Sequence, residues 1–185
     1  MPEKALNKSR RNAALVITLA ISAFFFWLFY NALKPPTLPL GTPMPALAFA
    51  SPAGPDSLKP FPGKTTLIML FTRHCPHCLY ELDLFEKHIG EFAGTGIYLA
   101  TTDRDFIPGI DNLRWPALSR MENFIWARLD EKQFSRHFGA AIAPSFFIFD
   151  HEGVLRDKIR GEIKLEALLA RIKPSEAVRE MQFIR

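Results

Sequence analysis

Cys75 and Cys78 are the only cysteines in the 185-residue chain, and they are three positions apart. A secreted protein held together by disulfides would carry several widely spaced cysteines. A disulfide that closes so small a ring stabilises a fold little, because the benefit grows with loop length. The pair is therefore predicted to do chemistry, and two neighbouring thiols can exchange disulfides or bind a metal.

The residues around the pair favour disulfide exchange. An apolar run at 67–71 predicts a buried strand, and a helical pattern follows it. Cys75 is then expected at the start of a helix, where backbone N–H groups and the helix dipole stabilise a thiolate. Pro76 suits the first helical position, and Cys78, one turn further on, is the resolving thiol. Nearby positive charge is expected from Arg73, His74 and His77.

Metal binding is the main alternative for this cluster. A closed zinc site needs four ligands, and the chain has no second cysteine pair. Mixed copper or zinc ligation by His74, His77 and the two sulfurs is the remaining form, although histidines so close in sequence do not easily join both sulfurs in one tetrahedron. Residue 79 is leucine, so the CxxCH pattern of haem attachment is absent. We therefore predict no metal and no cofactor.

Alternating strands and helices are predicted after residue 66. The strands are expected at 67–71, 97–101, 124–129, 145–150 and 154–160. Helices are expected along the apolar face from Cys78 to Phe92, ended by Gly94 and Gly96, at 131–138, and at 165–172, closed by Pro174. The last strand carries Arg156, Lys158 and Arg160 on one face, which is typical of an edge strand.

The N-terminal region has the pattern of a membrane anchor. Residues 12–33 contain no charge, and these 22 residues would form a helix of about 33 Å, against a hydrocarbon core of about 30 Å. Four cations precede it, namely Lys4, Lys8, Arg10 and Arg11, so residues 1–11 are predicted to stay in the cytoplasm. A cleaved signal peptide is the alternative, but its apolar region is usually shorter and the cleavage signal here is poor.

The rest of the chain divides into three parts. Residues 34–45 hold five prolines and are predicted to be a semi-rigid spacer. Residues 46–173 form the predicted globular domain, and residues 174–185 a C-terminal tail. The net charge of +4 is not gathered into a basic stripe with aromatic residues, so a nucleic acid partner is not expected.

The order of these features resembles the thioredoxin superfamily: a strand, a CxxC at a helix start, a second strand–helix unit, then Ala143-Pro144 before a hairpin and a final helix. The 66 residues from Cys78 to Pro144 resemble the spacing of the membrane-anchored TlpA/ResA/CcmG-like branch. Gly41-Thr42-Pro43 with Phe49, and the stretch 138–153, are similar to that branch too. The resemblance covers about residues 41–173.

This resemblance implies an α/β thioredoxin-like fold, with a central mixed β-sheet flanked by helices, and a protein-disulfide oxidoreductase. It implies that Pro144 is a cis-proline beside the CxxC and that Ala143 offers its backbone to substrate. It also implies that Glu81, beneath the active site, exchanges a proton with the resolving thiol. The alternative for Glu81 is a solvated helix glutamate, the interpretation given to Glu86.

The implied setting is the cytoplasmic membrane of a bacterium, with the catalytic domain in the periplasm or another extracytoplasmic space. The implied partners are client proteins with disulfides or thiols and a membrane electron donor of the DsbD/CcdA type. A TlpA-type reductase, for example in cytochrome c or copper-site maturation, is the expected function.

Departures from the resemblance leave the direction of electron flow open. His74 replaces a common tryptophan, Asp83 stands where a proline is common, and Pro76-His77 is the dipeptide of DsbA. A DsbA-like thiol oxidase is therefore one alternative. A Sco-like copper chaperone is another, although it would have a CxxxC motif and a distal histidine about where Ala143-Pro144 stands.

Overall fold

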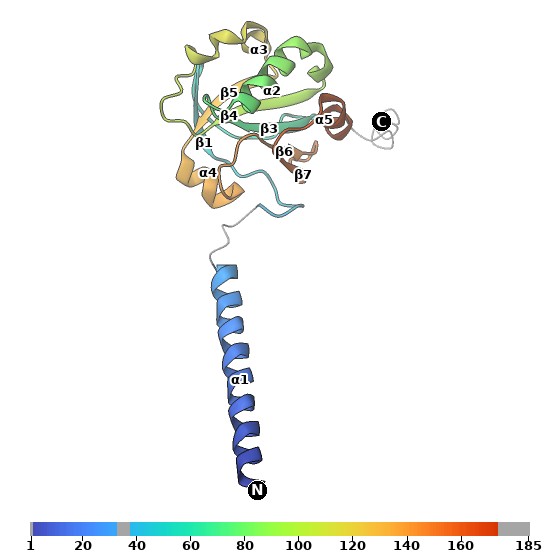
Figure 1. Ribbon diagram of the computed structural model, residues 1–185. Helices are drawn as coiled ribbons and strands as arrows, with labels where there is room; N and C mark the ends of the chain where they lie inside the picture. The colour runs from blue at the N-terminus through green and yellow to red at the C-terminus, as the bar shows by residue number, and fades with distance from the viewer. Residues whose placement is uncertain (1, 33–37, 174–185) are drawn as a thin grey trace, which may run out of the picture. The chain divides into compact units, whose positions relative to one another are not determined.

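The computed structural model describes residues 2–32 and 38–173 (Figure 1). Residues 2–32 form one helix, α1 (Pro2–Ala32), whose described apolar side chains, such as Leu19 and Phe26, are exposed. Among the described residues, no helix combines the length and the hydropathy that crossing a membrane requires. Outside the described residues lie Leu33, residues 34–37 of the predicted spacer, and the predicted tail at 174–185 with Pro174.

A seven-stranded mixed sheet forms the centre of the domain at 38–173, with the order β2-β1-β5-β4-β3-β6-β7. Its strands are β1 (Ala48–Ser51), β2 (Gly54–Ser57), β3 (Thr65–Phe71), β4 (Thr95–Thr101), β5 (Phe124–Leu129), β6 (Ser145–Phe149) and β7 (Leu155–Arg160). β3, β4 and β5 run parallel, and β6 pairs antiparallel with β3. β7 lies at one edge of the sheet and pairs antiparallel with β6. At the other side, β1 pairs antiparallel with β5, and β2, its hairpin partner, is the edge strand.

Helices cover both faces of this sheet, as Figure 1 shows. One face is covered by α2 (Pro76–Lys87), α3 (Pro116–Arg120) and α5 (Leu165–Ile172). The other face is covered by α4 (Glu131–Phe138). Alternate residues of β3 serve the two cores, since Met69 faces the α2 side and Ile68 the α4 side. Every residue of β3 is buried, which confirms the prediction of a strand covered on both faces.

The predicted elements after residue 66 are present, with strand ends shifted by one or two residues and one larger error at a helix end. α4 spans the predicted residues, and β7 is the edge strand that its charges indicated. The helix predicted from Cys78 to Phe92 ends instead at Lys87, because His88 leaves helical geometry and the next turn, Ile89–Phe92, is the 3₁₀ helix η1. Phe92 still packs on Phe85, with ring centroids 4.5 Å apart, so the apolar periodicity survives the break.

Candidate active site

Cys75 lies at the start of α2, at the carboxyl end of β3. It is the N-cap residue of α2, and its Sγ accepts a hydrogen bond from the backbone N–H of Cys78 at 3.4 Å. Pro76 occupies the first turn, where its missing N–H leaves no helical hydrogen bond unmade. The sulfur therefore sits at the positive end of the helix dipole, where a thiolate is stabilised.

The two thiols are held in unlike environments. The side chain of Cys75 is partly exposed, whereas Cys78 is completely buried. Burial raises the pKa of Cys78 to about 12, and its hydrogen-bonding contact with Cys75 adds to the shift. Cys78 therefore stays a thiol at neutral pH, and Cys75 is the sulfur that an external disulfide can reach.

Ala143 and Pro144 form the neighbouring wall of the site. The peptide bond between them is cis. The carbonyl oxygen of Ala143 lies 4.0 Å from the Sγ of Cys75, although 68 residues separate the two in the chain. Pro144 is buried and Ala143 is half-buried, so the backbone at residue 143 borders the reactive sulfur.

Glu81 is a buried carboxyl on the same helix as the thiols, with 2% of its surface exposed. Its Oε1 accepts a hydrogen bond from the backbone N–H of Ile163 at 3.2 Å. Burial raises the pKa of Glu81 above its ordinary value of 4.5, the hydrogen bond from Ile163 opposes the shift, and the charge of Glu162 adds to it. Glu81 follows Cys78 by three positions, a spacing that makes the two side chains neighbours on a helix.

The three expected cations differ in what they contact. The guanidinium of Arg73 donates to the carbonyl of Asp105 at 3.0 Å and pairs with the carboxylate of Asp111 at 3.3 Å. Its positive charge is therefore shared with the segment after β4. His74 is exposed, and the Nδ1 of His77 contacts Oε1 of Glu162.

Acidic residues on α2 hold the segment that follows β4. Asp83 accepts hydrogen bonds from Arg114 at 2.9 Å and from the indole N–H of Trp115 at 2.7 Å. Glu86 accepts from the backbone N–H groups of residues 117 and 118, at 2.8 and 2.9 Å, and so caps the short helix α3. The interpretation of Glu86 as a solvated helix glutamate is therefore wrong, because a helix that the sequence did not reveal lies against it.

Three consecutive residues between β7 and α5 were missed by the sequence analysis, and each touches a different group of the site. The N–H of Gly161 donates to the carbonyl oxygen of Pro144 at 2.8 Å. Glu162 contacts His77, and Ile163 donates to Glu81. We call residues 161–163 the β7–α5 connection. No local sequence signal marks it, because its contacts depend on how the sheet places β6 and β7 beside α2.

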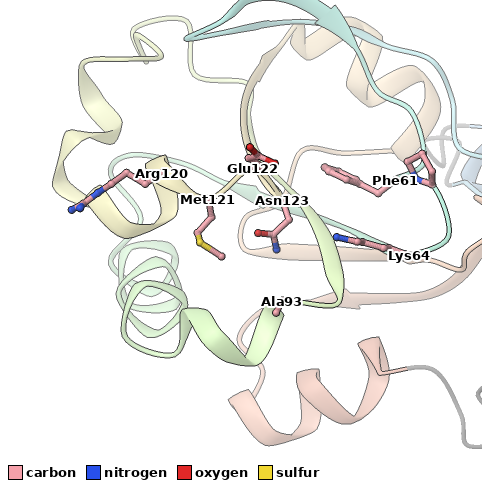
Figure 2. Close-up of a pocket in the computed structure, with 8 residues that line it drawn as sticks. Phe61, Lys64, Ala93, Arg120, Met121, Glu122 and Asn123 are labelled. Carbon is pink, nitrogen blue, oxygen red and sulfur yellow. The ribbon is translucent and has the colours of Figure 1, made fainter.

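A separate hollow of about 500 Å³ lies at the amino ends of the parallel strands, away from the cysteine pair (Figure 2). Its lining includes Lys64, Ala93 and Asn123, which lie one or two residues before the starts of β3, β4 and β5. The cysteine pair lies beyond the carboxyl end of β3, and parallel sheets usually bind ligands at the carboxyl ends of their strands. The hollow in Figure 2 is therefore not part of the candidate active site.

Solved structures resemble this domain over most of its length. StoA from Bacillus subtilis is 14% identical with a TM-score of 0.54, and the match covers 72% of this chain and 99% of that one. A putative thiol:disulfide interchange protein DsbE from Chlorobium tepidum is 18% identical with a TM-score of 0.55, covering 74% and 96%. A thiol:disulfide interchange protein from a Bacteroides species is 23% identical with a TM-score of 0.56, covering 73% and 88%.

The domain has a thioredoxin-like fold. The expected α/β class, with a central mixed sheet flanked by helices, is confirmed by these matches and by the observed topology. No protein-family profile matches the chain. No curated protein sequence matches it either.

Proposed function

We propose that this protein is a protein-disulfide oxidoreductase that exchanges disulfides with client proteins through Cys75 and Cys78. The observation that carries the proposal is the inequality of the two sulfurs: Cys75 is partly exposed at a helix start, and Cys78 is completely buried, which raises its pKa. Two of the solved structures with this fold, from Chlorobium tepidum and a Bacteroides species, are named as thiol:disulfide interchange proteins. Their names support disulfide exchange as the activity.

Reduction of a client would proceed in two balanced steps. The thiolate of Cys75 attacks one sulfur of the client disulfide, so that the client S–S bond breaks, a mixed disulfide forms and one client thiolate leaves. Cys78 then gives its proton to the carboxylate of Glu81, and its sulfur attacks Cys75. The second client thiolate leaves, the Cys75–Cys78 disulfide remains, and two electrons have passed to the client.

The mixed disulfide is formed beside the backbone of Ala143. We assign residues 143 and 144 to substrate binding, because the backbone of Ala143 borders the sulfur of Cys75. An extended client segment would lie against this edge. Arg73, His74, Pro76 and His77 are adjacent to the thiols in the sequence and are assigned to modulating their reactivity.

The proposed direction is reduction, as in TlpA-type proteins of cytochrome c or copper-site maturation, with electrons supplied by a membrane donor of the DsbD/CcdA type. The local chemistry favours the opposite direction, because His77 and the helix terminus stabilise the reduced form. About 150 mV, or roughly 7 kcal/mol for two electrons, separates thioredoxin from DsbA. A single nearby charge supplies about 1.4–4 kcal/mol, so one histidine does not bridge that gap.

An intermediate reduction potential is therefore expected, more oxidising than that of thioredoxin. His77→Pro should make the potential more negative, because it removes the imidazolium charge near the thiolate. Equilibration with glutathione measures the potential.

The redox state of the cysteine pair in vivo is measured by alkylation of acid-quenched cells. A mostly reduced pair supports a reductase, whereas a mostly oxidised pair makes the DsbA-like oxidase the correct function.

We further propose that residues 12–33 anchor the protein in the cytoplasmic membrane with its N-terminus inside. The proposal is supported by the charge-free apolar sequence of this segment and by the four cations that precede it. Protease added to spheroplasts should then remove the thioredoxin-like domain from the anchor. Protection in intact spheroplasts, with digestion only after lysis, would place the domain in the cytoplasm instead.

A further inference from the structure

Glu162 is placed where its charge can act on the active site. It belongs to the β7–α5 connection, whose neighbours Gly161 and Ile163 are hydrogen-bonded to Pro144 and Glu81. These two flanking bonds fix the backbone on both sides of Glu162. The carboxylate then meets the imidazole of His77, the third residue of the CPHC motif, across 85 residues of sequence.

We propose that Glu162 is a positioning residue that lowers the oxidising power of the Cys75–Cys78 disulfide through His77. Its carboxylate holds the imidazolium at the β7–α5 connection and offsets its positive charge. The thiolate of Cys75 consequently receives less stabilisation than the CPHC sequence alone would give. The inference rests on the proposed function, and it supplies a reason why a chain with the DsbA dipeptide would be a weaker oxidant than DsbA.

The strength of this effect is limited by solvent. The side chains of His77 and Glu162 are 65% and 51% exposed, so water and salt screen their charges. Exposed ion pairs contribute about 0.2–1 kcal/mol, which corresponds to a change of at most about fivefold in an equilibrium constant. Glu162 also lines a groove of about 500 Å³, whose other charged or titratable side chains are Tyr80, Glu81, His88, Lys164 and Glu166.

Glu162→Gln is the direct test, because it keeps the shape of the side chain and removes its charge. The reaction is reduction of the Cys75–Cys78 disulfide by two glutathione thiols, which yields the dithiol protein and oxidised glutathione. We measure it at pH 5.5, where an imidazole ordinarily carries its proton. The equilibrium constant, the alkylation rate of Cys75 by iodoacetamide, or both should rise about two- to fivefold, because each depends on how strongly the Cys75 thiolate is stabilised.

Three further variants separate the pair from a general change of charge. Glu166→Gln removes the same charge from the same groove. Its fold change in the equilibrium constant or in the alkylation rate should be less than half that of Glu162→Gln. Glu162→Asp keeps the carboxylate and should restore most of the original values. In a His77→Gln background, Glu162→Gln should have no more effect than Glu166→Gln, because the imidazolium through which it acts is gone.

The outcomes are distinguishable from one another and from failure of the proposed function. An unchanged equilibrium and an unchanged alkylation rate in Glu162→Gln would overturn the inference, as would a lower equilibrium constant. A shift equal to that of Glu166→Gln would also overturn it, since any nearby carboxylate would then serve. If the unsubstituted protein fails to exchange with glutathione at all, the proposed function itself is wrong.

Discussion

Cys78→Ala is expected to leave the protein covalently attached to its clients through Cys75. The first exchange step needs only Cys75, but release needs the second thiol, so the mixed disulfide persists once Cys78 is removed. Turnover should fall nearly to zero while high-molecular-weight adducts accumulate. Trapping thiols with acid and an alkylating agent, followed by non-reducing electrophoresis, measures these adducts, and they should disappear when a reductant is added.

Cys75→Ala is the matched control, and it should trap few clients. Cys78 is completely buried and its pKa is raised to about 12. Burial is the largest cause of this shift and is independent of Cys75, so Cys78 stays a thiol at pH 7, whereas the thiolate is the attacking species. Equal adduct formation by the two single variants would mean that the roles of the sulfurs have been assigned incorrectly.

Glu81→Gln is expected to slow the release step by about 100-fold, the lower end of the range for proton transfer by a positioned side chain. Glutamine keeps the oxygen that accepts the hydrogen bond from Ile163 but does not take up the proton of Cys78. The first step, attack by Cys75, should change little. Rapid-quench measurement of mixed-disulfide formation and decay separates the two steps, and the pH dependence of decay should lose the inflection due to Glu81.

The same variant should alter the pH dependence of stability in a defined direction. Burial raises the pKa of Glu81 above 4.5 in the folded protein, so the folded state keeps a proton that the unfolded state releases as the pH rises from 4.5 through the raised value. Folding stability therefore falls across that window. Glu81→Gln should be more stable than the unsubstituted protein at pH 7 and close to it at about pH 4. A loss of stability at pH 7, or an unaltered decay profile, would assign Glu81 to packing alone.

The parts of the fold that were predicted correctly are those with short-range signals. The strand at 67–71 is a continuous apolar run, and the proline at the first turn of α2 marks where the helix starts. α4 ends where Gly139 follows it, which is also a local signal. In each case the information lies within about one turn or one strand of the residue concerned.

The missed parts depend on partners that are distant in sequence. β1 and β2 are four residues each, and the sequence of β2, Gly-Pro-Asp-Ser, has no apolar alternation, so only pairing with β1 makes it a strand. η2 (Asp111–Arg114) has four residues and α3 has five, and both depend on contacts with α2. Glu162 belongs to the same class, because 85 residues separate it from His77.

The β7–α5 connection also bears on how this domain can change length. Surface loops usually accept insertions and deletions, because few hydrogen bonds of their backbone involve the rest of the fold. Here the N–H groups of Gly161 and Ile163 are both engaged by other elements, and only Glu162 lies between them. An added or deleted residue at 162 would misalign the neighbours of Pro144, His77 and Glu81 together. Length variation among descendants of this chain would therefore be confined to other loops, and this connection would change by substitution alone.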